Sequence, residues 1–311
     1  MLKISKRQQM ICNVVLSILG LVWLAPIIFV VLNIFKTKQE YNMGSFWQLP
    51  HSFAVIDNFK NVVANKLFVY MGSSLLYAVG GAVLAVFFSL LAAYGLTHLR
   101  IKHKMFWFLF IYSGTIFPFQ VYLIPIYRGY YKTGLYNTKF GMILFYCAIS
   151  IPFAMFVLRN FLMGISSEIC ESAKMDGATN WQVLVHILTP MAKAPISIVF
   201  LSQFTWCWND LMFGLTFTKS TNVRPVMASI SHESIGDVPS LFTACLLASI
   251  PTIVLFLFYR ITLKQVLLTQ ENNHTRRREN HGKNVECLFD PPFTYGYRLY
   301  RAPGENHALS L

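Results

Sequence analysis

No aspartate or glutamate occurs between Asp57 and Glu168 of this 311-residue chain, and this gap restricts the possible folds more than any other feature. A soluble domain of this length carries charges along its whole surface, on about a quarter of its residues. Here only 13% of the residues are charged and 55% are hydrophobic. Because so much apolar surface needs lipid as its solvent, the sequence predicts an integral membrane protein.

Six apolar blocks are long enough to cross a membrane as helices. A helix needs about 20 apolar residues to span the hydrocarbon core, and the blocks contain no charged residue except Asp210 in the fifth. We therefore predict an all-α, polytopic membrane protein with six transmembrane helices. The predicted spans cover residues 10–35, 67–99, 105–127, 140–158, 194–218 and 238–259.

Six spans place both termini on one side of the membrane, and we predict the cytoplasmic side of the cell membrane. Cytoplasmic loops are enriched in Lys and Arg, and the compact cluster of Arg100, Lys102 and Lys104 follows the second span. The same bias explains the net charge of +13 without nucleic-acid binding, because the basic residues border apolar blocks. The six cysteines form no CxxC pair and predict no disulfide framework.

The segment 164–191, between the fourth and fifth spans, has a different character because it contains three acids within nine residues, Glu168 to Asp176. Ser166 or Ser167 can cap a short helix, with Glu168 in its favourable first turn. Gly177 stands where that helix should end in a left-handed residue, a conformation that glycine adopts without steric cost. The pattern predicts a short helix followed by a sharp turn.

A second short helix is predicted directly after the turn. Thr179 and Gln182 have the spacing of a capping box, and Pro190 should stop the helix. Its expected apolar stripe consists of Trp181, Leu184, Val185 and Leu188. A helix–turn–helix of this kind suits docking on a partner protein, and it equally suits an amphipathic connector resting on the membrane.

The same segment carries a family resemblance. Glu171-Ser172-Ala173, then Gly177, then Ile187-Leu188-Thr189-Pro190 resembles the EAA loop of ABC importer permeases, and we refer to residues 164–191 as the EAA loop. Segments 117–128, 134–138, 152–162 and 203–219 look like the carbohydrate-uptake branch of that family. The resemblance covers residues 10–265, and the chain is similar to the second, maltose-type permease subunit of sugar importers.

The resemblance implies a permease subunit that moves a sugar or oligosaccharide by alternating access. Its partners would be a second permease subunit, two ATP-binding cassette subunits and an extracytoplasmic solute-binding protein. ATP would bind the partner ATPase, because this chain has no G-x4-G-K-[ST] loop, and the chain itself would need no cofactor and would not be an enzyme.

Within the EAA loop the resemblance assigns roles residue by residue. Glu171 would make a charged contact with the ATPase, Ala173 a close packing contact, and Gly177 the turn. Ser172 and Thr189 depart from the family pattern. The full set of expected coupling residues is Glu171, Ser172, Ala173, Asp176, Gly177, Ile187 and Pro190.

Polar residues inside the spans are candidates for the solute pathway. Asp210 is the one acid within a predicted span, and acids inside membranes are functional candidates by default. Trp206 and Asn209 lie beside it, and Gln120 is a weaker candidate. The alternative, which we favour, gives Asp210 a structural or gating role near the outer end of its span. The eight histidines show no metal-ligand pattern, so no metal site is predicted.

The chain thus divides into a cytoplasmic N-terminus at 1–9, a transmembrane domain at 10–265 and a tail at 266–311. The tail is polar and basic without apolar periodicity, which predicts disorder or a non-native segment. Two other functions remain as alternatives: an ABC permease for a non-sugar solute, and a membrane-embedded enzyme or self-sufficient channel. An enzyme would need converging acids or histidines, and a channel would not need a docking loop.

Overall fold

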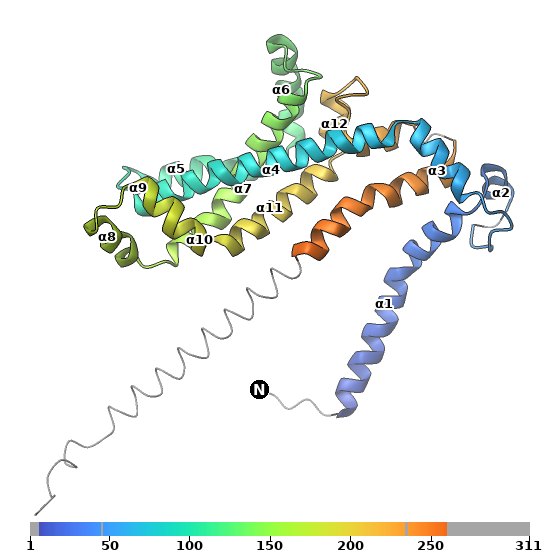
Figure 1. Cartoon of the computed structure of the whole chain (residues 1–311), viewed down its shortest axis with the longest axis horizontal. Helices are drawn as coiled ribbons and strands as arrows, with labels where there is room; N and C mark the ends of the chain where they lie inside the picture. The colour runs from blue at the N-terminus through green and yellow to red at the C-terminus, as the bar shows by residue number, and fades with distance from the viewer. Residues whose placement is uncertain (1–5, 45, 234–235, 260–311) are drawn as a thin grey trace, which may run out of the picture. The chain divides into compact units, whose positions relative to one another are not determined.

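The computed structural model describes residues 6–44, 46–233 and 236–259, and every regular element within these ranges is a helix (Figure 1). The all-α prediction is therefore confirmed. The predicted tail at 266–311 and the first residues of the N-terminal segment 1–9 lie outside the described residues.

The helices follow one another with short connections. The first six are α1 (Lys6–Ile34), α2 (Lys38–Met43), α3 (Val55–Ala64), α4 (Leu67–His98), α5 (Lys104–Tyr112) and the short η1 (Ser113–Thr115). The next six are α6 (Gln120–Thr133), α7 (Lys139–Met163), α8 (Ser167–Met175), α9 (Asn180–Gln182), η2 (Val183–Leu188) and α10 (Thr189–Met191). The last are α11 (Lys193–Trp208), α12 (Met212–Phe217), α13 (Val226–Glu233) and the helix Val238–Tyr259.

Four of the described helices are long and apolar enough to cross a membrane by themselves: Arg7–Ile34, Leu67–His98, Lys139–Met163 and Val238–Tyr259. Two bent pairs raise the number to six if each is one broken span. The first joins Lys104–Thr115 to Gln120–Thr133 at 93°, and the second joins Asn180–Met191 to Lys193–Trp208 at 78°.

The third and fifth predicted spans, 105–127 and 194–218, are each interrupted and do not form one continuous helix. The segment 105–127 breaks before Pro118, because a proline disfavours helical geometry in the residue that precedes it. The segment 194–218 leaves the helix after Trp208 and resumes at Met212 in α12. Asp210 lies in this break and not inside a helix.

Helix α4 forms the centre of the fold and packs against α7 and α11 (Figure 1). Small residues line its buried face, which allows the close backbone approach that membrane helices use in place of hydrophobic collapse. These are Ser74, Ala78, Gly81, Ala82, Ala85, Ser89 and Ala93. A Cβ atom at Gly81 would lie only 2.9 Å from Cβ of Tyr146 on α7.

Helix α1 differs from the rest in its exposure. None of the residues in its apolar window is buried inside the chain, so the face of this helix needs lipid or another protein to cover it. Its C-terminal end is held, because the Asn33 and Asn58 side chains donate to the carbonyls of Phe46 and Ile34 at 3.2 and 2.8 Å.

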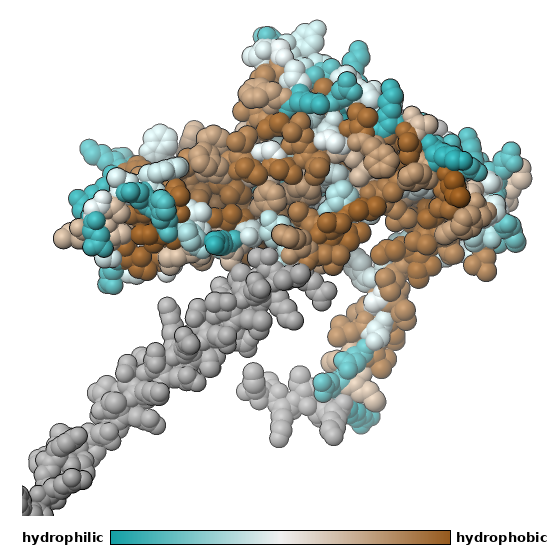
Figure 2. All heavy atoms as spheres, in the orientation of Figure 1, coloured by the Kyte–Doolittle hydropathy of each residue, from teal (hydrophilic) through white to brown (hydrophobic). Residues whose placement is uncertain are grey.

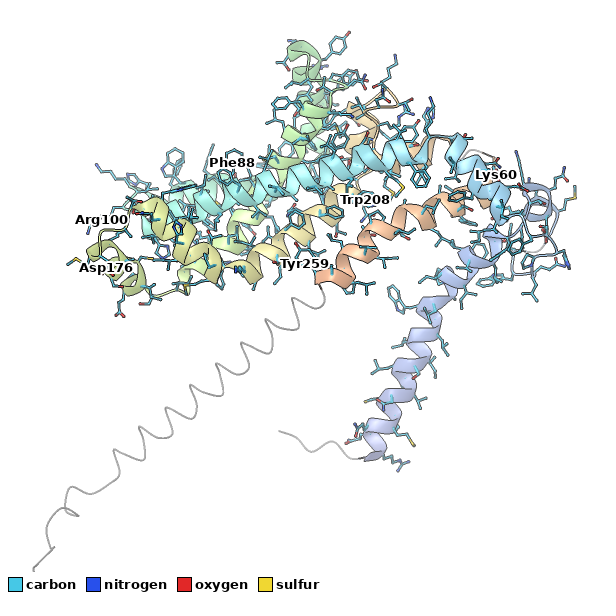
Figure 3. The ribbon with its side chains drawn as sticks, in the orientation of Figure 1. Lys60, Phe88, Arg100, Asp176, Trp208 and Tyr259 are labelled. Carbon is cyan, nitrogen blue, oxygen red and sulfur yellow. The ribbon has the colours of Figure 1, made fainter. Side chains whose placement is uncertain are left out.

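Hydrophobic side chains cover the lengths of the helices, while hydrophilic residues gather near α8 and α2 (Figure 2). Arg100 and Asp176 lie at one end of α4, and Lys60 lies at the other (Figure 3). The basic cluster that follows the second predicted span therefore shares an end with the EAA loop.

Candidate functional site

The first helix of the EAA loop, α8, begins and ends as the sequence predicts. Ser166 is its N-cap and accepts a hydrogen bond from the backbone N–H of Glu168 at 3.3 Å. Cys170 and Ala173 face the protein interior, whereas Glu171 and Ser172 are exposed. Burial raises the pKa of the Cys170 thiol, so it packs as a neutral apolar group.

The turn after α8 is a Schellman motif centred on Gly177. Gly177 has φ +87°. Its N–H donates to the carbonyl of Lys174, and the N–H of Ala178 donates to the carbonyl of Ala173, both at 3.0 Å. These two bonds satisfy carbonyls that the end of a helix leaves free. The prediction of a left-handed glycine at this position is confirmed.

The second helix opens with the predicted capping box. The N–H of Gln182 donates to Oγ1 of Thr179 at 3.3 Å, and the N–H of Thr179 donates to Oε1 of Gln182 at 2.8 Å. Pro190 was expected to stop this helix. Helical structure continues one residue further, through Met191, and the chain bends at Ala192.

The predicted apolar stripe of the second helix is only half right. Leu184 and Leu188 are buried, but Trp181 is 54% exposed and Val185 is 37% exposed, while Val183 is fully buried instead. The buried face is rotated from the predicted stripe, because Val183, Leu184 and Leu188 pack into a cluster with α4 and α7. Residues 183–188 also form the π-helical turn η2, in which the N–H of Thr189 reaches back five residues to the carbonyl of Leu184, and such turns are frequent at functional sites.

One buried cluster joins the EAA loop to three long helices. Its members come from α4, α7, α8, η2 and α11, and are Leu90, Ala93, Tyr94, Ala154, Leu158, Leu162, Cys170, Val183, Leu184, Leu188 and Val199. The Tyr94 hydroxyl also lies 3.2 Å from Oδ1 of Asn180. The loop is therefore fixed to the helices on its inner side and free on its outer side.

The outer side of the EAA loop presents an exposed tip. Glu171, Ser172, Asp176 and Gly177 are exposed there, and Met175 is 87% exposed. Sequence reasoning missed Met175, although its position directly before the predicted turn could have indicated it. Of the other expected coupling residues, Ala173 and Ile187 are half-buried and Pro190 is exposed.

A cavity of about 980 Å³ lies between the EAA loop and the end of α4. Glu171 and Lys174 line it from α8, and Arg100 and Lys104 line it from the basic cluster. The structure thus brings the expected ATPase contact, Glu171, to the basic loop that the sequence placed in the cytoplasm. Such a mixture of charges suits a polar contact with another protein.

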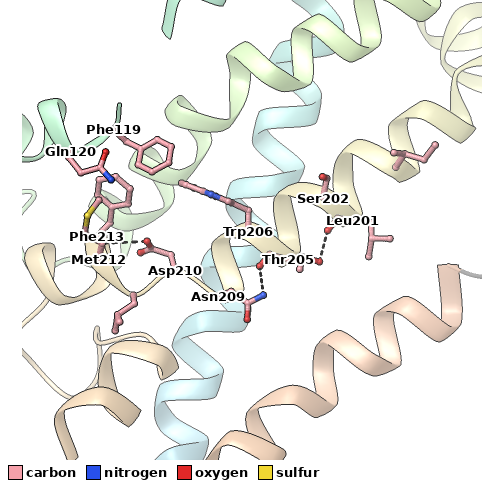
Figure 4. Close-up of a pocket in the computed structure, with 12 residues that line it drawn as sticks. Phe119, Gln120, Leu201, Ser202, Thr205, Trp206, Asn209, Asp210, Met212 and Phe213 are labelled. Atoms are coloured by element: carbon pink, nitrogen blue, oxygen red, sulfur yellow. Dashed lines mark hydrogen bonds between the residues drawn. The ribbon is translucent and has the colours of Figure 1, made fainter. Parts of the chain in front are cut away.

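The four candidate pathway residues meet at a second cavity, which we call the aromatic cavity (Figure 4). It measures about 890 Å³, and Gln120, Trp206, Asn209 and Asp210 all line it. Phe119, Phe213 and Trp206 surround one part of it, with Phe119 and Trp206 ring centroids 6.2 Å apart. Its other lining residues are Ile198, Leu201, Ser202, Thr205, Leu211 and Met212.

Asp210 is held by hydrogen bonds from two helices. Its Oδ2 accepts from the Tyr146 hydroxyl of α7 at 2.9 Å and from the N–H of Gly214 at 3.0 Å. Its Oδ1 faces the N–H of Phe213 at 3.4 Å. The carboxylate thus satisfies the first free N–H groups of α12, which agrees with the structural role favoured from the sequence.

Within the described residues no group of three or more His, Cys, Asp or Glu side chains could hold a metal ion. The five cysteines there are free, and Cys147, Cys170 and Cys207 are buried. The two cavities therefore remain as the candidate sites.

Comparison with known proteins adds the family context. Residues 3–266 match the family described as binding-protein-dependent transport system inner membrane component. The chain is 30% identical to "Probable ABC transporter permease protein YurM" of Bacillus subtilis over 75% of this chain and 78% of that protein. It is 23% identical to "Diacetylchitobiose uptake system permease protein NgcG" of Streptomyces coelicolor over 82% and 86%.

A solved structure of a bacterial ABC transporter involved in the import of the acidic polysaccharide alginate contains a chain of the same fold. It superposes with a TM-score of 0.71 over 84% of this chain and 99% of that chain, at 21% identity. At this identity the likeness shows the fold.

Proposed function

Since the chain belongs to the binding-protein-dependent transport system inner membrane components, the permeases of ABC importers, we propose that it carries a sugar or oligosaccharide across the cell membrane by alternating access. The EAA loop receives the force of a separate ATPase subunit. The chain itself holds no nucleotide, and ATP hydrolysis is the work of that partner.

The observation that carries this proposal is the two-sided construction of the EAA loop. Its outer tip exposes Glu171, Met175 and Asp176, and its inner side is packed into α4, α7 and α11. Because packed cores are bistable and do not deform continuously, a push on the tip moves the long helices together. A connector that only rests on the membrane would not need side chains packed into the three helices α4, α7 and α11.

The proposed partners follow from the family. Two such permeases and two ATPase subunits would make one transporter, with a solute-binding protein on the outer face. We place Arg100 and the EAA loop in the cytoplasm, Lys60 outside and both termini inside, because basic clusters are retained in the cytoplasm. The solved structure of an alginate transporter in complex with a periplasmic protein supports a receptor on the outer face.

The sugar assignment draws support from the relatives and from the aromatic cavity. One relative is a diacetylchitobiose uptake permease. Aromatic rings beside amides and hydroxyls, as in Trp206, Asn209 and Ser202, are suited to sugars, whose faces are apolar and whose edges bear hydroxyl groups.

Charge reversal at the tip tests the coupling role. Glu171→Lys should leave membrane insertion and subunit assembly intact, and it should lower sugar uptake by about tenfold or more, because a reversed charge at a protein contact costs several kcal/mol. The measurements are ATPase activity and uptake by the complete transporter in vesicles. Asp57→Lys is the matched control, since this exposed acid lies at the opposite end of the fold. Normal uptake by Glu171→Lys would overturn the coupling assignment.

A further inference from the structure

We propose that the aromatic cavity admits uncharged, polyhydroxylated solutes and excludes anionic ones, and that the carboxylate of Asp210 is the excluding group. The inference rests on the proposed transport function and specifies its substrate class. It follows from the charges on the cavity wall, which the sugar assignment alone does not address.

The wall of the aromatic cavity contains one charged residue, and that residue is negative. Lys, Arg and His are absent from its twelve lining residues. A neighbouring cavity of about 280 Å³ shares Phe119, Ser202 and Trp206 with it, and its remaining lining residues are also uncharged. Among the described residues, then, no cation lines either of the two cavities that share Trp206.

An anionic solute in this path would lose much of its hydration without gaining a partner. Burying a carboxylate or phosphate is costly unless a cation or several donors compensate it. The donors nearest Asp210 are already used, because the Tyr146 hydroxyl and the N–H groups of Phe213 and Gly214 bind its own oxygens. No salt bridge to Asp210 occurs in the described part of the chain, so its negative charge acts on whatever enters.

Uncharged sugars meet no such penalty. Trp206 is half-buried and offers its ring, and Ser202 and Asn209 are exposed in the cavity. The Asn209 amide nitrogen donates to the carbonyl of Thr205 at 2.9 Å, which orients the side chain and leaves its oxygen available for a hydroxyl group (Figure 4). Such a wall binds hydroxyl groups and apolar sugar faces without any charge.

The structurally similar transporter takes a charged solute, which this chain is not expected to do. That transporter imports an acidic polysaccharide, yet the shared fold does not fix the charge of the solute, because function resides in the site and not in the fold. For this chain the wall chemistry predicts the opposite preference.

Thiol labelling in the cavity provides the test. Ser202→Cys places a reactive thiol on the wall, and Ser231→Cys, at an exposed position on α13, is the matched control outside it. The complete transporter in nanodiscs is treated with trimethylammonioethyl or sulfonatoethyl methanethiosulfonate, which are cationic and anionic. Each rate is corrected for the unsubstituted protein and divided by the rate with a free thiol.

The expected result is a cation-to-anion rate ratio of about ten at Ser202→Cys, because the reagents differ by two charge units near one carboxylate. The control should give a ratio near one. Adding Asp210→Asn should abolish the preference, and adding Asn209→Lys, at an exposed position that tolerates the change, should invert it. If Asp210→Asn fails to fold, the Asn209→Lys arm still decides.

Failure of this proposal is distinguishable from failure of the proposed function. Labelling can be measured without ATP and does not require transport, so uptake lost in Glu171→Lys with a ratio near one at Ser202→Cys would overturn the charge filter and leave the permease assignment standing. A corrected rate for the anionic reagent equal to or above that of the cationic one overturns the proposal.

Discussion

At the residue scale, Gly177 shows how one backbone angle can determine a functional shape. No atom lies within 4 Å of the position where its Cβ would be, yet φ is +87°. The position therefore requires glycine for its conformation and not for lack of space. Asp176 and Met175 are exposed at the tip because the chain reverses there.

Gly177→Ala should destabilise the EAA loop by about 1–2 kcal/mol, the cost of a left-handed alanine. Gly72→Ala, in helix α4, is the matched control, because it too has nothing within 4 Å and lies in an ordinary helix. Alanine should there be neutral or stabilising by about 0.5–1 kcal/mol. Thermal unfolding of the purified variants measures both, and equal shifts would contradict the conformational explanation.

The surroundings of Glu40 predict a pH dependence in the segment between α1 and α3. The hydrogen bond from the Ser52 hydroxyl, together with that from the N–H of His51 at 2.6 Å, lowers the pKa of the Glu40 carboxyl. A lowered folded-state pKa gives stability that is present above the unfolded pKa of about 4.3 and is lost as the pH falls through the folded value.

Acidification from pH 6 to pH 3.5 should therefore loosen residues 37–53, because protonated Glu40 is a weaker acceptor. Hydrogen exchange, corrected for its intrinsic pH dependence, measures this opening. Glu40→Gln should exchange faster at pH 6 and should show little further change at pH 3.5. Unchanged protection of the natural loop across this range would contradict the prediction.

At the element scale, the close contact between α4 and α7 depends on the small size of the side chains on the buried face of α4. The small residues of α4 recur with helical spacing, and Ala78, Ala82, Ala85 and Ala93 are fully buried. The spacing of these small residues is visible in the sequence and could have indicated which face of the helix is buried. An apolar block alone, which is what we used to predict this span, does not indicate the buried face.

Gly81→Leu should push α4 and α7 apart, because even a Cβ would lie 2.9 Å from Cβ of Tyr146. Overpacking of this kind costs about 1–3 kcal/mol or more. Gly72→Leu on the same helix meets no atom within 4 Å at its Cβ and should be tolerated. The yield and melting temperature of the two purified variants give the comparison, and similar values would show that the close approach is not required.

Helix boundaries were predictable where local chemistry sets them and not where packing does. The Ser166 cap, the Thr179–Gln182 capping box and the Gly177 turn were all predicted, because each depends on neighbouring residues alone. The break at Asn209–Leu211 and the π-helical turn η2 were not. The break coincides with a contact to a distant segment, the hydrogen bond from Tyr146 to Asp210, and the residues of η2 pack into a cluster with α4 and α7.

The sequence singled out four candidate pathway residues, and the structure brings all four to one cavity, but how that cavity is built could not be predicted. Gln120 and Asp210 are far apart in sequence, and only the fold shows that both line one cavity. The hydrogen bonds that occupy Asp210 could not be predicted, since nothing in the sequence pairs it with Tyr146. The absence of cations from the wall likewise becomes meaningful only once the wall is known.

At the scale of the whole molecule, the chain has the features of one component among several. The apolar window of α1 has no residue buried within the chain. The EAA loop presents its tip outward, and the sequence has no phosphate-binding loop. Lipid or another protein must cover the apolar face of α1, and in the proposed function the tip of the EAA loop contacts a separate ATPase subunit.

The purified chain alone in lipid vesicles should therefore show no sugar flux above that of empty vesicles. Vesicles that also contain the second permease, the ATPase subunits, the receptor and ATP should accumulate sugar. Radiolabelled uptake measures both, and a complex with a hydrolysis-deficient ATPase is the control. Flux through the chain alone, with or without ATP, would contradict the subunit assignment and favour a channel.

Tyr146 takes part in two contacts of α7. A Cβ atom at Gly81 of α4 would lie 2.9 Å from its Cβ, and its hydroxyl group donates a hydrogen bond to the carboxylate of Asp210. Tyr146 therefore connects the packing of α4 against α7 with the one negative charge on the cavity wall. The residue that limits how closely two central helices approach also positions that acid, so helix packing and the electrical character of the lining share a single side chain.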